Sequence, residues 1–136
     1  MKGLLETMSN RDDCPFCQLD STRIVSEDDF CIAIRDQAPI TKLHTLIITK
    51  RHTPNYFKLT QRENDSIWRM LNTLRETLLK IDSTITAFNI GTNVGTAAGQ
   101  TVFHCHFHLI PRRNKNKEIS GETTLGDFSF SPANQK

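Results

Sequence analysis

The chain has 136 residues, which is enough for one domain with a sizeable core and too short for two ordinary domains. Its formal net charge is +2 and its one basic cluster is the short stretch 112–117, so the composition argues against a protein that wraps long nucleic acid. The apolar runs are too short for a transmembrane helix, and the first ten residues do not resemble a signal peptide. We therefore expect a cytoplasmic protein with no membrane partner.

The first half of the chain predicts short strands. Residues 1–13 are polar and are expected to form an N-terminal arm. Further along, β-branched and apolar residues alternate with turn-forming residues, which predicts strands at 22–25, 29–35 and 44–49.

A single long helix is predicted at residues 60–81. Its apolar residues recur at steps of three and four, which places them on one face. Thr60 and Glu63 have the spacing of a capping box, which marks the start of the helix.

Two more strands are predicted at 86–90 and 101–110, separated by a glycine-rich connection at 91–100. Pro111 is expected to end the second of these strands, and the polar residues 113–136 are assigned no structure. This order of elements, without repeated βαβ units, predicts an α+β fold with a mainly antiparallel sheet.

Three histidines alternate along the last predicted strand. His104, His106 and His108 are expected to share one face, because side chains on a strand alternate between faces. Cys105, Phe107 and Leu109 then form the opposite row, which faces the core. A single histidine is usually a buried or hydrogen-bonded residue, and two alternating histidines can also bind zinc. Three in strict alternation favour catalytic chemistry.

The glycine-rich connection precedes these histidines directly. Gly95, Gly99 and the small residues between them allow backbone N–H groups to approach a phosphate. Gln100 and Thr101 add side-chain donors. An ordinary hairpin connection would look similar, but its place before three histidines favours an anion site.

The four cysteines fall into two groups. Cys14 and Cys17 form a C-x-x-C pair, which in a reducing compartment indicates a metal site or a redox motif. Cys31 and Cys105 lie within apolar stretches and are expected to be buried thiols.

The stretch 99–112 closely resembles the signature of the histidine-triad (HIT) superfamily, in which three histidines alternate with apolar residues. The resemblance extends upstream through Asn93, the segment 44–52 and the Cys-Pro-Phe-Cys start, so the expected domain covers residues 14–112. It implies the HIT fold, with a five-stranded, mainly antiparallel sheet and one long helix. It also implies a homodimer in which the two sheets join.

The same resemblance implies an enzyme that cleaves at the α-phosphate of dinucleoside polyphosphates, nucleoside phosphoramidates or related nucleotides. The central histidine, His106, would be the nucleophile and would form a nucleotidyl-histidine that water releases. His108 would contact the phosphate, Gln100 and Thr101 would orient it, and His44 would lie beside the triad. The alternatives are a nucleotidyltransferase or phosphorylase of the same fold, or a nucleotide-binding regulatory module.

The resemblance also implies binding residues for a purine nucleotide. Asp36 corresponds to a ribose-binding position, Ile32 and Ile34 to walls of the base pocket, and Asn93 to a residue near the ribose or phosphate. Residues at strand ends are often of these types without any such role, so the structural explanation carries about equal weight.

Bacterial-type relatives often hold a structural zinc ion. The matching positions here are Cys14, Cys17, His52 and His104, a Cys₂His₂ set suited to a closed tetrahedral site. We therefore expect a structural zinc site that takes no part in the chemistry.

Two departures from the family pattern stand out. Leu43 precedes His44 where many members have glycine, so the local backbone is expected to differ there. The ending Leu-Ile-Pro-Arg at 109–112 favours similarity to the dinucleoside polyphosphate hydrolase branch.

Overall fold

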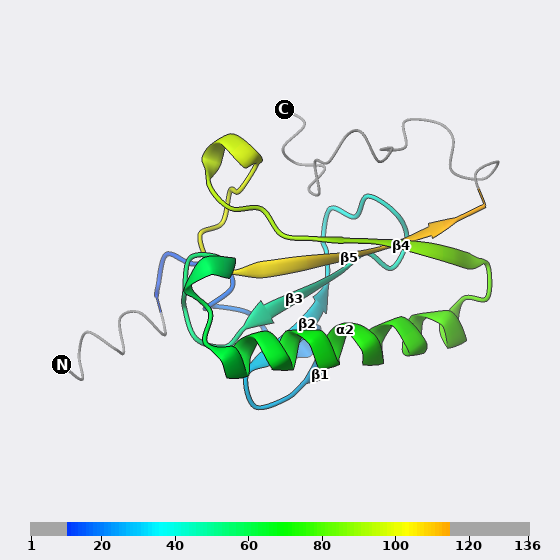
Figure 1. Cartoon of the computed structure of the whole chain (residues 1–136), viewed down its shortest axis with the longest axis horizontal. Helices are drawn as coiled ribbons and strands as arrows, with labels where there is room; N and C mark the ends of the chain where they lie inside the picture. Colours follow the sequence, from blue (N-terminus) through cyan, green and yellow to red (C-terminus); the bar gives the residue numbers. More distant parts are fainter. Residues whose placement is uncertain (1–10, 115–136) are drawn as a thin grey trace.

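The computed structural model describes residues 11–114. One long helix packs on one face of a five-stranded sheet (Figure 1). The elements are η1 (Ser21–Arg23), β1 (Ile24–Glu27), β2 (Cys31–Arg35), β3 (Thr45–Thr49), η2 (Tyr56–Lys58), α2 (Gln61–Ile81), β4 (Ile85–Gly91), η3 (Thr96–Ala98) and β5 (His106–Arg113). The strand order is β1-β2-β3-β5-β4, and each neighbouring pair is antiparallel. The predicted α+β architecture is therefore confirmed.

Helix α2 begins as the sequence predicts. The Glu63 N–H donates to Thr60 Oγ1 at 3.1 Å, and the Thr60 N–H donates to the Glu63 carboxylate at 2.9 Å, which completes the capping box. The helix buries Ile67, Leu74 and Leu78 against the sheet. None of its described residues forms a span long and apolar enough to cross a membrane, and the same holds for the rest of the described chain.

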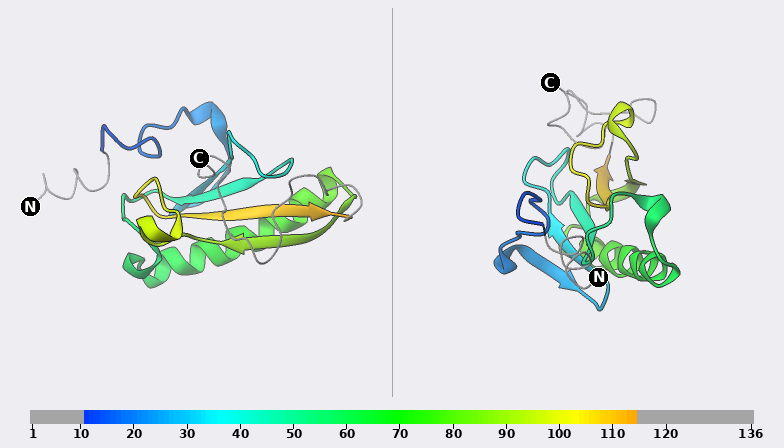
Figure 2. Two further views of the ribbon diagram at one scale, coloured as in Figure 1. Left: turned by 90° about the horizontal axis from the view of Figure 1, so that it is seen from above. Right: turned by 90° about the vertical axis from the view of Figure 1, so that its left-hand side faces the viewer.

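The two faces of the sheet are covered by different parts of the chain. Helix α2 covers one face, and the N-terminal segment that precedes β1 crosses the other (Figure 2). On this second face Ile32, Ile34, Leu46 and Ile48 form a small apolar cluster. Phe16 and other partly buried side chains of the N-terminal region pack against it. This second face also carries the histidines of β5, as described below.

The start of the last strand differs from the prediction. β5 begins at His106 and not at residue 101, so residues 101–105 form an irregular segment before it. This segment still contacts the sheet, because the Thr49 N–H of β3 donates to the Cys105 carbonyl at 3.5 Å, and the Cys105 N–H in turn donates to the Thr53 carbonyl at 2.7 Å. A bond to a loop residue holds the backbone here in place of a regular ladder.

The end of the last strand also differs, because Pro111 lies inside β5 and does not end it. β3 begins at Thr45, opposite Leu109, so beyond this point β5 pairs with β4 alone. A residue without an N–H is tolerated where one side of a strand has no ladder partner. The strand then continues to Arg113, one residue into the segment predicted as a polar tail. Residues 115–136 of that tail and most of the N-terminal arm lie outside the described residues.

Leu43, where relatives often have glycine, has a φ of +74°. This is the left-handed conformation that glycine adopts without steric cost. The backbone thus keeps a glycine-like turn before His44, and the leucine side chain packs against the helix-side core.

Candidate active site and metal centre

His106 lies on the face of β5 opposite to the helix, with Ile48 of β3 as its register partner. Its Nδ1–H donates to the carbonyl of His104 at 2.8 Å. A carbonyl can only accept, so in the neutral ring Nδ1 carries the proton and Nε2 carries a lone pair. Burial lowers the pKa of His106, which keeps the ring neutral near pH 7. The arrangement prepares Nε2 to act as a nucleophile.

His108 is held by a short chain of hydrogen bonds. The Ile40 N–H donates to His44 Nδ1 at 3.0 Å, so the proton of a neutral His44 lies on Nε2. This Nε2–H donates to His108 Nδ1 at 2.9 Å, which places the proton of His108 on its own Nε2. Burial lowers the pKa of His44 to about 4 and that of His108 to about 2. His108 is therefore a neutral ring that offers an N–H donor beside His106.

A cavity of about 260 Å³, here called the catalytic cavity, opens at these two histidines. Five of the residues predicted to bind or act on a nucleotide line it. They are Asp36, Asn93, Thr101, His106 and His108. The structure thus brings together residues from the end of β2, the glycine-rich connection and β5.

Four other predicted residues do not line the catalytic cavity in the described part of the chain. His44 is fully buried behind His108. Gln100 is 3% exposed, and its amide accepts from the Gly95 N–H and donates to two backbone carbonyls, at 2.7 and 3.1 Å. Ile32 and Ile34 are buried in the second-face cluster, beneath residues that do reach the cavity.

Sequence reasoning missed several residues that line the cavity, among them Phe16, Leu46 and Arg23. The Phe16 ring meets the His106 ring edge-on, with centroids 5.0 Å apart, and Leu46 is the register partner of His108. The Arg23 guanidinium reaches the cavity and donates to the Arg35 carbonyl at 3.2 Å. The Cys-Pro-Phe-Cys spacing gave a signal for Phe16, because it fixes Phe16 between two candidate metal ligands. No comparable sequence signal pointed to Arg23.

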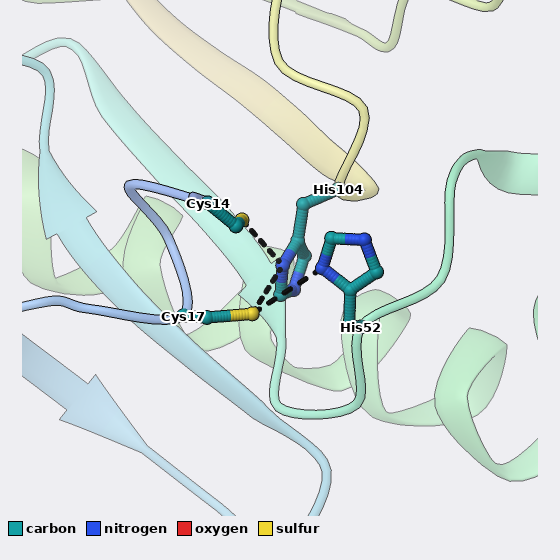
Figure 3. A group of neighbouring side chains, drawn as sticks. All are labelled: Cys14, Cys17, His52 and His104. Carbon is teal, nitrogen blue, oxygen red and sulfur yellow. Dashed lines mark hydrogen bonds between the residues drawn. The ribbon is translucent and has the colours of Figure 1, made fainter. Parts of the chain in front are cut away.

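His104 lies on the same side of the sheet as His106, because the Phe16 ring meets both histidine rings edge-on, with centroids 6.0 and 5.0 Å apart. It precedes β5, and its side chain turns toward Cys14, Cys17 and His52 (Figure 3). Its Nε2–H donates to the Thr49 carbonyl at 2.7 Å, which leaves a lone pair on Nδ1.

The four atoms that face one another here fit a tetrahedral metal site. His104 Nδ1 lies 3.3 Å from Cys14 Sγ and 3.6 Å from Cys17 Sγ, and His52 Nδ1 lies 3.3 Å from Cys17 Sγ. Zinc bonds of about 2.3 Å to sulfur and 2.0 Å to nitrogen would place such atoms about 3.5 Å apart. The donor set, its spacing and the lone pair on His104 Nδ1 are compatible with four ligands to one metal ion.

Comparisons with known proteins agree with this arrangement. A family model described as the HIT domain matches residues 19–115. The chain belongs to the HIT family. An uncharacterized HIT-like protein of Borreliella burgdorferi is 36% identical over 105 residues, which cover 74% of this chain and 76% of that relative. The adenylylsulfatase HINT3 of Arabidopsis thaliana is 31% identical over 118 residues, which cover 84% of this chain and 59% of the longer relative.

Solved structures of the family have the same fold. A zinc-bound histidine triad family protein from Mycobacterium smegmatis superposes with a TM-score of 0.71 at 30% identity, covering 86% of this chain and 87% of that one. The predicted HIT fold is therefore confirmed, and hydrolases and zinc-bound proteins both occur among its relatives.

Proposed function

We propose that the protein is a nucleotide hydrolase that acts at the α-phosphate of dinucleoside polyphosphates, nucleoside phosphoramidates or related nucleotides. The observation that carries the proposal is the hydrogen bond from His106 Nδ1–H to the His104 carbonyl. It leaves the Nε2 lone pair of His106 at the wall of a cavity that also contains a neutral N–H donor, His108.

The reaction has two displacements at one phosphorus. His106 Nε2 attacks the α-phosphorus, an N–P bond forms, and the bond to the leaving group breaks with its electron pair. Water then attacks the same phosphorus, the N–P bond returns its electrons to Nε2, and a proton passes to solvent. The His108 Nε2–H donates to a phosphate oxygen and stabilises the negative charge that develops there.

The remaining residues divide between binding and support. Asp36 accepts from the ribose hydroxyls of a purine nucleotide, and Asn93 and Thr101 donate to ribose or phosphate oxygens. Gln100 holds the glycine-rich connection through its three backbone hydrogen bonds. The base packs on an apolar floor formed with Ile32 and Ile34 beneath it.

We further propose that Cys14, Cys17, His52 and His104 hold a structural zinc ion. When bound, zinc supplies a tetrahedral crosslink and no chemistry on the substrate. The crosslink joins the N-terminal segment to the irregular segment before β5. It thereby fixes the His104 carbonyl that sets the tautomer of His106.

His106→Ala tests the mechanism. We expect turnover of adenosine 5′-phosphoramidate and diadenosine tetraphosphate by the variant to fall at least about 1,000-fold, because the substitution removes the ring nitrogen that forms the intermediate. Binding of adenosine monophosphate, measured by calorimetry, should be retained.

Mass spectrometry of rapidly quenched wild-type protein should find one nucleotidyl group on the peptide that contains residue 106, and none in the variant. Turnover by His106→Ala at the wild-type rate would overturn the mechanism. The same assay, run with added inorganic phosphate, separates hydrolysis from transfer: a transferase would release the nucleoside diphosphate.

A further inference from the structure

A second and larger cavity lies on the other side of the irregular segment 101–103. Its volume is about 630 Å³, within the range of small-molecule binding sites. The residues that line it are Arg11, Asp13, Cys14, Pro15, His52, Pro54, Thr101, Val102 and Phe103. None of the catalytic roles above uses Phe103, which lines this cavity.

The second cavity adjoins the catalytic cavity. Pro15, Thr101 and Val102 line both. A ligand whose phosphate lies against His106 can therefore pass over this shared wall into the second cavity. The catalytic cavity is only about 260 Å³, below the usual volume for a whole drug-sized ligand. A substrate with two nucleosides exceeds this volume, so its second nucleoside must lie outside the catalytic cavity.

The walls of the second cavity favour an uncharged aromatic group over phosphate. Two prolines, Val102 and Phe103 provide apolar surface, and Phe103 is 47% exposed. Arg11 lies 3.5 Å from the Asp13 carboxylate, so the charges of the two side chains offset each other. An exposed aromatic ring without net charge nearby is a stacking platform for a nucleic-acid base.

We propose that the second cavity binds the nucleoside of the leaving group, with its base stacked on Phe103. The preferred substrate is then a dinucleoside polyphosphate, with one nucleoside in each cavity and the phosphate chain over the shared wall. This inference rests on the proposed hydrolase function and names the substrate class of that site.

Phe103→Ala tests the inference with two substrates that differ in the leaving group. We expect kcat/KM for diadenosine tetraphosphate to fall between about 5-fold and 150-fold, the range for losing one base–aromatic stack. Turnover of adenosine 5′-phosphoramidate should stay within about twofold, because its leaving group is ammonia and does not reach the second cavity. Phe103→Tyr keeps an aromatic face and should restore the wild-type preference.

Phe57→Ala is the matched control, since Phe57 is 75% exposed and does not line either cavity. It should leave the ratio of the two kcat/KM values unchanged. An equal loss on both substrates, or no loss on diadenosine tetraphosphate, would overturn the inference. The metal content of each variant is measured alongside, because Cys14 and His52 also line the second cavity.

A binding experiment separates this inference from the proposed function. In a His106→Ala background, calorimetry should find that Phe103→Ala weakens the binding of diadenosine tetraphosphate by the same factor. The affinity for adenosine monophosphate should be unchanged. That result supports nucleoside binding in the second cavity even if the wild-type protein hydrolyses neither substrate. Absence of hydrolysis would overturn the hydrolase proposal alone. Equal affinities with and without Phe103 would overturn the inference.

Discussion

Two backbone carbonyls determine which nitrogen is available in two neighbouring histidines. The His104 carbonyl accepts from His106 Nδ1, and the Thr49 carbonyl accepts from His104 Nε2. Each bond leaves a lone pair on the opposite nitrogen, on Nε2 of His106 and Nδ1 of His104. The first faces the catalytic cavity and the second faces two thiols. His104 thus connects the two sites: its carbonyl orients His106, and its side chain faces the cysteines.

The buried His44 predicts a loss of stability in mild acid. Burial lowers its pKa from 6.5 to about 4; Asp36 opposes this shift, Arg112 adds to it, and the neighbouring His108 is also neutral. The unfolded chain binds a proton at His44 below pH 6.5 and the folded chain does not. Its contribution to the free energy of unfolding is therefore complete above pH 6.5 and is lost as the pH falls toward 4, by up to about 3 kcal/mol.

His44→Gln should flatten this part of the pH dependence, because glutamine does not titrate. Urea unfolding of wild-type protein and variant at pH 8 and pH 5 measures the difference. His104 and His108 also have lowered pKa values, so the variant should keep part of the slope. A slope identical to that of the wild-type protein would contradict the burial of a neutral His44.

The identity of the site residues could be read from the sequence better than their contacts. The pattern of histidines and cysteines is enough to name candidates. It does not reveal that the Gln100 side-chain amide forms hydrogen bonds with three backbone groups, because those groups come together only in the folded loop. Nor does it reveal the His44–His108 contact, which depends on the pairing of β3 with β5.

At the level of elements, helix α2 and strand β5 show why one boundary is predictable and another is not. The start of α2 is set by Thr60 and Glu63, which are neighbours in sequence and act locally. The start of β5 is set by distant groups, because Thr53 holds the backbone of Cys105 and the cysteine pair faces His104. Local signals cannot report such contacts.

The link between the N-terminal segment and the segment before β5 predicts a metal-dependent element. Protein purified without chelator should contain about one zinc ion per chain. Cys17→Ser should lose the metal and lower the melting temperature, because zinc binds the folded site and contributes its binding energy to folding. Cobalt substitution of the wild-type protein should give the visible absorption of a tetrahedral site.

Cys31→Ala is the matched control for the metal. Cys31 is also buried, but it lies in the helix-side core, away from the metal cluster. It should keep the zinc ion and the cobalt spectrum while losing some core stability. Absence of zinc from the wild-type protein would remove the zinc proposal and leave the mechanism at His106 in place.

At the scale of the whole molecule, one edge of the sheet is suited to association. β4 is an edge strand, and its outer backbone groups have no ladder partner among the described residues. Ile90 is 55% exposed and Trp68 of α2 is 67% exposed, beside a groove of about 160 Å³ between strand and helix. An exposed edge with an apolar groove is a site for pairing with another chain. We propose that a second copy covers it, joining two sheets at β4.

Ile90→Lys should convert the dimer to a monomer, because a lysine on an edge strand opposes strand pairing and places charge in the apolar groove. Size-exclusion chromatography with light scattering, at micromolar concentrations, measures the mass of each form. Phe57→Lys is the control: it removes an apolar side chain of greater exposure outside this edge and should leave the dimer intact. A wild-type protein that is monomeric throughout this range would contradict the proposal.

The dimer also predicts an effect on the catalytic strand. Ile90 is the register partner of Leu109 and Gly91 that of His108, so β4 is the strand that supports β5 on its outer side. Covering β4 should protect both strands from local opening. Hydrogen exchange should therefore be faster in β4 and β5 of Ile90→Lys than in the wild-type protein, with β1 and β2 unchanged. If β1, β2, β4 and β5 of a monomeric variant are each protected as strongly as in the wild-type protein, the edge contact does not stabilise the site.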